Sequence, residues 1–266
     1  MTALWSVVFV AAVAVLSKNY GIYSELFPAG ASTEVATTAD TGCDEYHGYQ
    51  IEFLSSDPLM IRIPNFISPA ESAFFTGILA QNFTYRLYVN EEDVKNEIAP
   101  RLAVLDQHDP YVTCILNRAQ HFLGSMASPD FELLSVARYG VSHQVSLHTD
   151  ASPEPLEDPK TKRQFNRRTS FFVYVHSSDD LEGGETYFPQ IPPPSNVDLS
   201  THPGIVAVNN ASGQPGLAVK PVSRSAVFWL GMKPDGTVDR STIHKGLPVT
   251  KGEKIGMNIW AKHYLD

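Results

Sequence analysis

The C-terminal half of the chain consists of short apolar segments separated by turn-forming residues, and this pattern restricts the fold more than any other feature. The segments are rich in β-branched and aromatic residues, which favour strands, and Gly, Pro, Asn or Asp residues lie between them. Many short strands with turn signals between them predict a mainly β domain of the sandwich or jelly-roll type. The predicted strands occupy residues 131–140, 145–150, 170–177, 185–189, 216–220, 226–232 and 255–264.

Two amphipathic helices are predicted upstream of these strands, after a first strand near residues 60–67. The first helix begins after Ser68 and runs to about Gln81, because Ser68, Pro69 and Glu71 have the spacing of an N-cap, a first-turn proline and a capping box. The second occupies residues 111–123, where apolar residues recur with helical spacing.

Two polar, proline-rich stretches interrupt the strand pattern, at residues 151–166 and 190–215. Loops of this length in a compact domain are usually functional lids or disordered segments. Because both stretches flank, in sequence, the segments that carry the candidate metal residues His148, Asp150 and His244, we expect them to overhang the opening of that site.

The N-terminus differs from the rest of the chain, since residues 3–16 are almost uninterrupted apolar sequence. As a helix this segment spans about 21 Å, less than the roughly 30 Å of a bilayer core. We therefore predict a signal peptide or a short signal-anchor in residues 1–20, a linker in residues 21–49 and one folded domain in residues 50–266. This predicts a protein of the secretory pathway, in the endoplasmic reticulum lumen or secreted, or attached to the membrane through its N-terminus.

Two further features fit this route. Asn82 and Asn210 begin glycosylation sequons, so a glycoprotein is expected. Cys43 and Cys114 are the two cysteines of the chain, and they either pair in an oxidising compartment or remain two buried thiols.

Composition excludes one broad class of function. The net charge is −9 and the pI is about 5.4, whereas a general nucleic-acid binder needs a basic face. The hydrophobic content of 43% is sufficient for a sizeable core.

His148, Asp150 and His244 form the candidate metal site. One residue separates His148 from Asp150 on a predicted extended strand, so both side chains project near the same edge of a sheet. A histidine from a distant strand then completes a set of three ligands on one face of a metal ion. Two neutral imidazoles and one carboxylate, with open positions, suit Fe(II) that must also hold a chelating co-substrate and O2. Zinc more often takes four protein ligands, or three and a water.

Lys254 is the candidate anion-binding residue. It lies directly before the apolar run of residues 255–260, which predicts a buried strand. A buried lysine is costly without an anion, so we expect Lys254 to point into the domain and bind a carboxylate, rather than to be a solvated surface lysine.

Several segments, in order, resemble the prolyl 4-hydroxylase family of Fe(II)/2-oxoglutarate dioxygenases. Residues 138–150 (RYGVSHQVSLHTD) resemble the first iron-ligand segment of that family, and residues 181–189 (LEGGETYFP) resemble its EGGET-x-F-P turn. Residues 167–175, 216–221 and 232–236 match further segments, and the spacing from His244 through Lys254 to Trp260 matches the last. Together the matches cover about residues 60–264.

The resemblance implies a double-stranded β-helix of cupin-like architecture with the N-terminal helices packed on one sheet. It implies Fe(II), 2-oxoglutarate and O2, with ascorbate as a further cofactor. It also implies release of succinate and CO2 as an unactivated C–H bond is hydroxylated, most directly on peptidyl proline. The residues to which it gives roles are His148, Asp150 and His244 as catalytic iron ligands, Lys254 and Tyr139 as partners of the distal 2-oxoglutarate carboxylate, and Thr186 as a lesser contributor.

The sequence departs from the family where the substrate would bind. Val145 replaces a tyrosine that packs on the peptide, and Lys262 replaces a histidine that faces the substrate. Arg167 matches an arginine of the substrate channel, and Trp260 is retained. Arg167, Val145 and Trp260 are therefore the candidate substrate-binding residues.

Two alternatives remain open. The altered Val145 and Lys262 favour, to some degree, a stand-alone dioxygenase of a free amino acid or small natural product. A non-catalytic jelly-roll binding module is the second alternative, but such a module would not need His148, Asp150, His244 and Lys254 together.

Overall fold

The structure is a computed structural model that describes residues 44, 47–79, 85–86, 98–126 and 130–265. Its larger sheet has nine strands within this part of the chain, in the order β1–β2–β13–β8–β16–β5–β4–β3, with β7 beside β8. The strands are β1 (Glu52–Ser56), β2 (Leu59–Ile63), β3 (Tyr85–Arg86), β4 (Arg101–Val104), β5 (Ser135–Tyr139), β7 (Leu156–Glu157), β8 (Gln164–Ser177), β13 (Ser225–Leu230) and β16 (Lys254–Tyr264).

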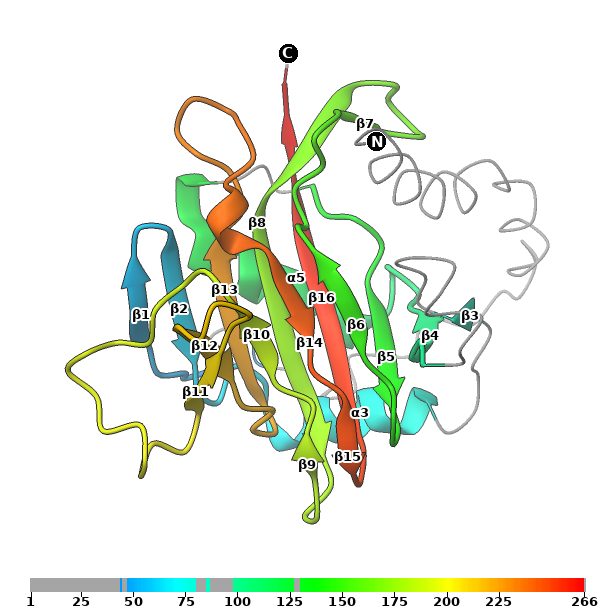
Figure 1. The fold of residues 1–266 in the computed structure, drawn as a ribbon. Helices are drawn as coiled ribbons and strands as arrows, with labels where there is room; N and C mark the ends of the chain where they lie inside the picture. The colour runs from blue at the N-terminus through cyan, green and yellow to red at the C-terminus, as the bar shows by residue number, and fades with distance from the viewer. Residues whose placement is uncertain (1–43, 45–46, 80–84, 87–97, 127–129, 266) are drawn as a thin grey trace.

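A smaller sheet lies in front of the larger one (Figure 1). It has the order β11–β12–β10–β14–β6, and a short pair of strands, β15–β9, lies beside it in the described residues. Its members are β6 (Val145–His148), β10 (Thr186–Phe188), β11 (Ile205–Asn209), β12 (Pro215–Val219) and β14 (His244–Gly246), while β9 is Glu182–Gly183 and β15 is Val249–Lys251. All the pairings are antiparallel, as a jelly roll requires.

Helices α3 (Pro69–Leu79) and α5 (Pro110–Leu123) cover the other face of the larger sheet. The predicted capping box of α3 is confirmed: the Ser68 backbone N–H donates to Glu71 Oε2 at 2.7 Å, and the Glu71 N–H donates to Ser68 Oγ at 3.2 Å. Asp109 caps α5 by accepting from the Tyr111 N–H. Short 3-10 turns are η1 (Gly124–Met126) and η2 (Arg240–Thr242).

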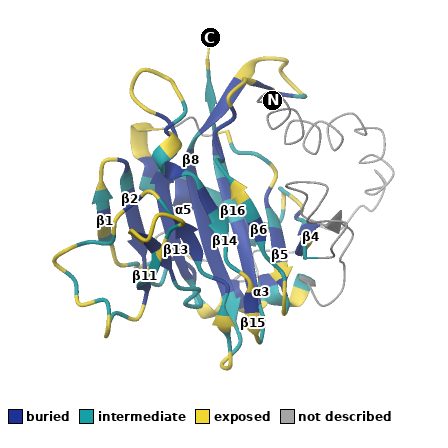
Figure 2. Ribbon diagram, viewed as in Figure 1, coloured by how far each residue is buried: buried dark blue, intermediate teal, exposed yellow. Residues whose placement is uncertain are grey.

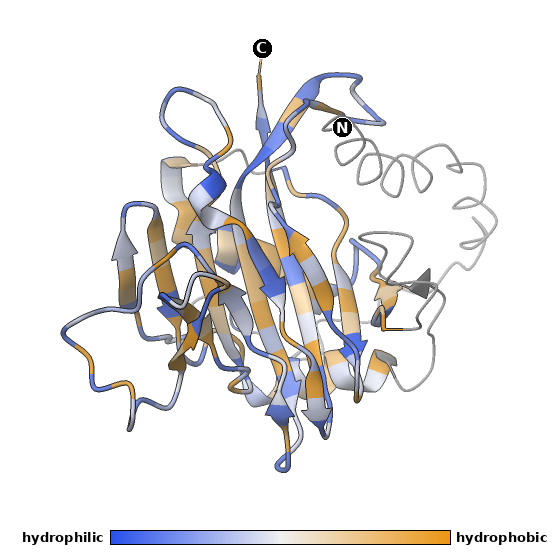
Figure 3. Cartoon of the chain, viewed as in Figure 1, coloured by the Kyte–Doolittle hydropathy of each residue, from blue (hydrophilic) through white to orange (hydrophobic). Residues whose placement is uncertain are grey.

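Strand β8 separates two cores because its side chains alternate between the faces of the larger sheet. Phe171, Val173 and Val175 pack against the helices, whereas Phe172 and Tyr174 point between the two sheets. Figure 2 shows the central strands as buried and the connecting loops as exposed, and Figure 3 shows the same strands as the apolar part of the chain. The site lies in the second core, between the sheets.

The predicted fold class, mainly β with N-terminal helices and a jelly-roll arrangement, is confirmed. The two proline-rich stretches, however, are not continuous loops. β11 lies within residues 190–215, and β7 and the start of β8 lie within residues 151–166. β7 has only two residues and β11 lies at a sheet edge, and each pairs with the strand that follows it.

The predicted signal peptide, most of the linker, Cys43 and the Asn82 sequon lie outside the described residues. Cys114 is disulfide-bonded, which excludes the alternative of two unpaired thiols. No helix in the described part of the chain is long and apolar enough to cross a bilayer.

Candidate active site

His148, Asp150 and His244 converge in the structure. β6 and β14 pair so that His148 and His244 lie directly opposite each other, and their ring centroids are 4.3 Å apart. Asp150 Oδ1 lies 3.6 Å from His148 Nε2 and 3.9 Å from His244 Nε2. One ligand atom from each residue lies within 4.8 Å of the others, so a single cation can contact all three.

Both imidazoles are oriented by their other ring nitrogen. His148 Nδ1 lies 2.7 Å from the Ser146 carbonyl oxygen, and His244 Nδ1 lies 3.0 Å from that of Thr242. A carbonyl can only accept, so each Nδ1 carries the proton and each Nε2 presents a lone pair to the site. Burial, together with the neighbouring His148, lowers the pKa of His244 to about 4, although Asp150 opposes this shift. His244 is therefore neutral at physiological pH, as a metal ligand must be.

Asp150 is fixed from two sides. Its Oδ2 accepts a hydrogen bond of 3.0 Å from Trp260 Nε1, which leaves Oδ1 facing the histidines. Burial alone would raise the pKa of Asp150, but the nearby His148, His244 and Arg167 hold this pKa well below its usual range. The carboxylate is therefore ionised and available to a cation.

Lys254 points into the pocket from the first residue of β16 and is 1% exposed. Its Nζ donates to the Gly184 carbonyl oxygen and lies 4.5 Å from the centroid of the Tyr139 ring. Burial lowers the pKa of Lys254 to about 7, and the charge of Glu185 only partly opposes this. No carboxylate of the described residues forms an ion pair with it, so the site has an uncompensated cation that suits an anionic ligand.

Gly184 explains how the lysine reaches this position. Gly184 has a positive φ of 76°, and a Cβ there would lie 3.2 Å from Val249 Cγ2 and 3.3 Å from Lys254 Cδ. A glycine therefore lets the turn approach the Lys254 side chain closely enough for its carbonyl to accept the hydrogen bond.

Tyr139 and Thr186 lie where the sequence predicted contributors to this anion site. Tyr139 pairs with Lys254 across β5 and β16, and burial raises the pKa of its hydroxyl far above the usual range, so the hydroxyl remains a donor. Thr186 Oγ1 lies 2.6 Å from the hydroxyl of Tyr174, which orients it.

Most of these groups line one open pocket. His148 and His244 of the candidate metal triad lie on its lining together with Lys254, and aromatic rings form much of the wall. The residues that line it are Tyr139, Val145, His148, Phe172, Thr186, Trp229, His244, Gly246, Lys254, Asn258 and Trp260.

The three predicted substrate residues have different positions. Val145 and Trp260 line the pocket. Arg167 is 1% exposed and lies behind the Trp260 ring, with its guanidinium carbon 3.9 Å from the ring centroid. The structure thus brings Arg167 to the back of the pocket wall rather than to its surface.

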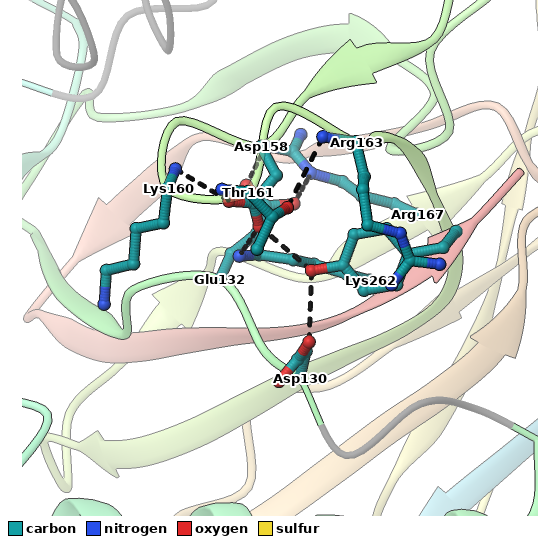
Figure 4. A network of polar contacts seen from close by, with 9 residues as sticks. Asp130, Glu132, Asp158, Lys160, Thr161, Arg163, Arg167 and Lys262 are labelled. Carbon is teal, nitrogen blue, oxygen red and sulfur yellow. Dashed lines mark hydrogen bonds and ion pairs between the residues drawn. The ribbon is translucent and has the colours of Figure 1, made fainter. Parts of the chain in front are cut away.

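Lys262, at the other position that departs from the family, also points away from the pocket. Its Nζ donates to Asp158 Oδ2 at 2.5 Å, and the Tyr264 hydroxyl donates to the same oxygen at 3.0 Å. This group fixes the turn between β7 and β8 (Figure 4).

Sequence reasoning missed several pocket residues, among them Asn258, Trp229 and Phe172. Asn258 had a usable signal, because residues 254, 256, 258 and 260 share one face of a strand and two of them were already assigned to the site. Phe172 lies over Gly256, where a Cβ would be only 2.3 Å from its ring. That contact depends on strand pairing and has no local signal.

Comparison with known proteins identifies a consistent set of relatives. A family model described as the 2OG-Fe(II) oxygenase superfamily matches residues 134–262. Prolyl 4-hydroxylase 5 of Arabidopsis thaliana is 26% identical over 236 residues, covering 86% of this chain and 77% of the relative. Prolyl 4-hydroxylase subunit alpha-2 of Gallus gallus is 31% identical over 155 residues, covering 58% of this chain and 24% of the relative.

Among solved structures, the fold is similar to that of a viral collagen prolyl hydroxylase from Paramecium bursaria Chlorella virus-1, solved as a complex with 2OG. The TM-score is 0.53 and the identity 20%, over 76% of this chain and 95% of the viral one. At this identity the likeness concerns the fold.

Proposed function

We propose that the chain, which matches the 2OG-Fe(II) oxygenase superfamily over residues 134–262, is a prolyl 4-hydroxylase-like dioxygenase that hydroxylates proline within a peptide. The observation that carries the proposal is a single pocket lined by both His148 and His244, which converge with Asp150, and by Lys254, a buried lysine. A binding module that had lost catalysis would not need both the three metal ligands and the lysine.

The residues fit Fe(II). Two imidazole nitrogens and one carboxylate oxygen lie within 4.8 Å of one another beside the pocket, and two histidines with one carboxylate are the ligand set of non-haem iron oxygenases. When bound, Fe(II) with 2-oxoglutarate and O2 supplies the oxidising chemistry that yields succinate, CO2 and a hydroxylated product. The protein binds and orients these groups, supplies the charges that hold them, and surrounds them with side chains that exclude water.

The residues also fit 2-oxoglutarate. Lys254 would bind its distal carboxylate, with the Tyr139 hydroxyl as a second donor and Thr186 beside them. An ammonium and a carboxylate in this buried setting form a charge-assisted hydrogen bond, roughly twice as strong as a neutral one. The distance between the two ends of the pocket then fixes which end of the co-substrate meets the metal.

The charges near the pocket support a neutral substrate. Among the described residues that line it, Lys254 is the one lysine or arginine. Arg167 is held by Glu132, and Lys262 by Asp158. A free amino acid would bring a carboxylate of its own into the pocket, in addition to that of 2-oxoglutarate, and no second cation lines the pocket to bind it. A proline within a peptide has no free carboxylate.

The second candidate is a small neutral metabolite. Val145 lines the pocket and offers no aromatic ring on which a proline could pack. Such packing would contribute about 1 kcal/mol beyond the effect of burying apolar area. This observation keeps a small-molecule substrate as the alternative.

The test is succinate release from 2-oxoglutarate with Fe(II), measured on matched substrates. Proline-rich peptides capped at both termini are compared with free proline, other free amino acids and small neutral metabolites. We expect turnover with capped peptides and little with free proline. Turnover with a free amino acid or metabolite, and none with any peptide, would contradict the peptide assignment.

We also propose that the protein follows the secretory route. The disulfide at Cys114 supports an oxidising compartment. Of the two sequons, Asn210 is half-buried and its side-chain amide already donates to the Pro189 carbonyl, so we expect a glycan at Asn82 first. Mass spectrometry of the protein from a secretory host tests this, and an intact Met1 in a cytosolic, unglycosylated pool would contradict it.

A further inference from the structure

Glu132 and Arg167 form an ion pair directly behind the wall of the pocket (Figure 4). Arg167 Nε lies 2.5 Å from Glu132 Oε1, and one of its terminal nitrogens lies 2.8 Å from Glu132 Oε2. The side chains are 1% and 13% exposed. A two-pronged contact of this kind fixes the plane of the guanidinium as well as its position.

The fixed guanidinium supports Trp260. Its carbon atom lies 3.9 Å from the centroid of the Trp260 ring, a cation–π contact that strengthens when it is desolvated. On its edge, Trp260 donates from Nε1 to Asp150 Oδ2. A continuous chain of contacts therefore runs from Glu132 through Arg167 and Trp260 to the carboxylate of the metal-binding triad.

Glu132 is tied to Trp260 by its backbone as well. The Glu132 N–H donates to the Trp260 carbonyl at 3.0 Å, and Phe131 forms a bridge with Ala261. The segment around Glu132 thus runs beside the end of β16. Glu132 itself lies just outside the region that the family model matches.

We propose that Glu132 is a positioning residue for the metal centre, acting through Arg167 and Trp260 on Asp150; this inference rests on the proposed function. The terminal torsion of an aspartate is soft, so either oxygen can turn towards a cation. The Trp260 N–H holds one oxygen and leaves the other for the metal. Glu132 also balances the charge of Arg167, which would otherwise face Asp150 and compete with a divalent cation for it.

The experiment measures metal binding without turnover. Co(II) alone is titrated into the full chain and followed by its visible absorption, with Glu132→Gln compared with the wild type. We expect the Co(II) Kd to rise roughly 10-fold or more, the scale for partners that orient metal ligands. Arg167→Lys, which keeps the charge but loses the planar stack, should weaken Co(II) binding as well.

A double-mutant cycle separates positioning from general stability. Trp260→Phe keeps a ring over Arg167 but removes the N–H. If Glu132 acts through Trp260, Glu132→Gln should have a clearly smaller effect on the Co(II) Kd in the Trp260→Phe background. Additive effects would overturn the proposal, because independent sites add.

The chain offers a matched control in a second buried ion pair. Arg118 and Glu71 make a similar two-pronged contact, at 1% and 0% exposure, in the helical layer. Glu71→Gln should lower Tm yet leave the Co(II) Kd unchanged. If Glu132→Gln behaves in the same way, the pair is only structural and the inference is wrong. A wild-type chain that neither binds Co(II) nor consumes 2-oxoglutarate would instead contradict the proposed function.

Discussion

The two ends of the pocket hold their charges in different ways. At the metal end, Asp150 accepts from Trp260, faces two oriented imidazoles and lies near Arg167. At the other end, Lys254 donates to one backbone carbonyl oxygen and lies against the faces of aromatic rings. Consequently burial lowers the pKa of Lys254 to about 7, while the partners of Asp150 more than cancel the effect of burial on its carboxyl.

This difference shows how the pocket is organised for its ligands. The metal end is assembled by the protein, so a cation finds its ligands already in place. The lysine end is completed only when an anion arrives, since a buried ammonium without a counter-charge is unfavourable. Changes at the two ends should therefore have separable consequences.

The largest effect is expected at the metal end. His148→Ala should abolish turnover, by more than the roughly 10- to 100-fold loss that follows removal of a supporting partner. Because the His148 side chain is 16% exposed at the end of a strand, Tm should change little. Succinate release and a thermal melt are measured together, with His108→Ala, outside the pocket, as the control. Residual turnover near the wild-type rate would remove His148 from the metal site.

The next effect is expected at the lysine end. Lys254→Ala should raise the Kd for 2-oxoglutarate roughly 10- to 150-fold, because a hydrogen bond to a charged group contributes about 1.5–3 kcal/mol. The Co(II) Kd measured without 2-oxoglutarate should stay within a factor of two or so. Calorimetry on the Co(II)-loaded protein gives the first value and absorption titration the second. Equal changes in both constants would mean that the two ends are not separable.

The pH dependence of 2-oxoglutarate binding sharpens the comparison further. Only the protonated Lys254 attracts a carboxylate, and its pKa in the free protein is about 7. Affinity should thus be highest below about pH 7 and fall as pH rises, by up to about tenfold per pH unit, with proton uptake on binding. Calorimetry in buffers of different ionisation enthalpy measures that uptake.

Lys254→Met is the control for this pH dependence, because it keeps the length of the side chain and has no proton to gain. Its affinity should be low and flat between pH 6.5 and 8.5. A wild-type profile that is equally flat would show that Lys254 stays charged throughout the range.

The smallest effect is expected on the wall between the two ends. Val145→Tyr should improve kcat/KM on capped proline peptides severalfold, because an aromatic face adds about 1 kcal/mol to ring packing. Val145→Leu adds volume without a ring and should not improve it. Equal behaviour of the two variants would remove Val145 as the position that limits peptide use.

Much of the fold and the chemical centre could be predicted from local sequence. The capping box at Ser68 and Glu71 depends on residues three apart. The strand pattern depends on side chains that alternate along one segment. His148 and Asp150 were found from residue types and a short spacing, whereas His244 and Lys254 were joined to them by the resemblance to the dioxygenase family. For the capping box, the strands and the His148–Asp150 pair, the physical cause lies within a few residues of chain, so it leaves a readable pattern.

The proline-rich stretches show the limit of that approach. β11 and β7 pair with the next strand along the chain, and the polar and proline residues around them hide this pairing in the sequence. Arg167 is a similar case. The resemblance to the family suggested a channel residue, but in the structure Arg167 pairs with Glu132, 35 residues away, and lies against the Trp260 ring.

The sequence by itself determined the kinds of group this protein uses: two histidines and a carboxylate for a metal, and a lysine for an anion. Only the tertiary structure decided how those groups are held. The pairing of β6 with β14 sets His148 opposite His244, and the pairing of β8 with β16 brings Arg167 against Trp260, whose N–H donates to Asp150. Such support comes from contacts between distant segments, whose energy depends on geometry that forms only when the two sheets close on each other.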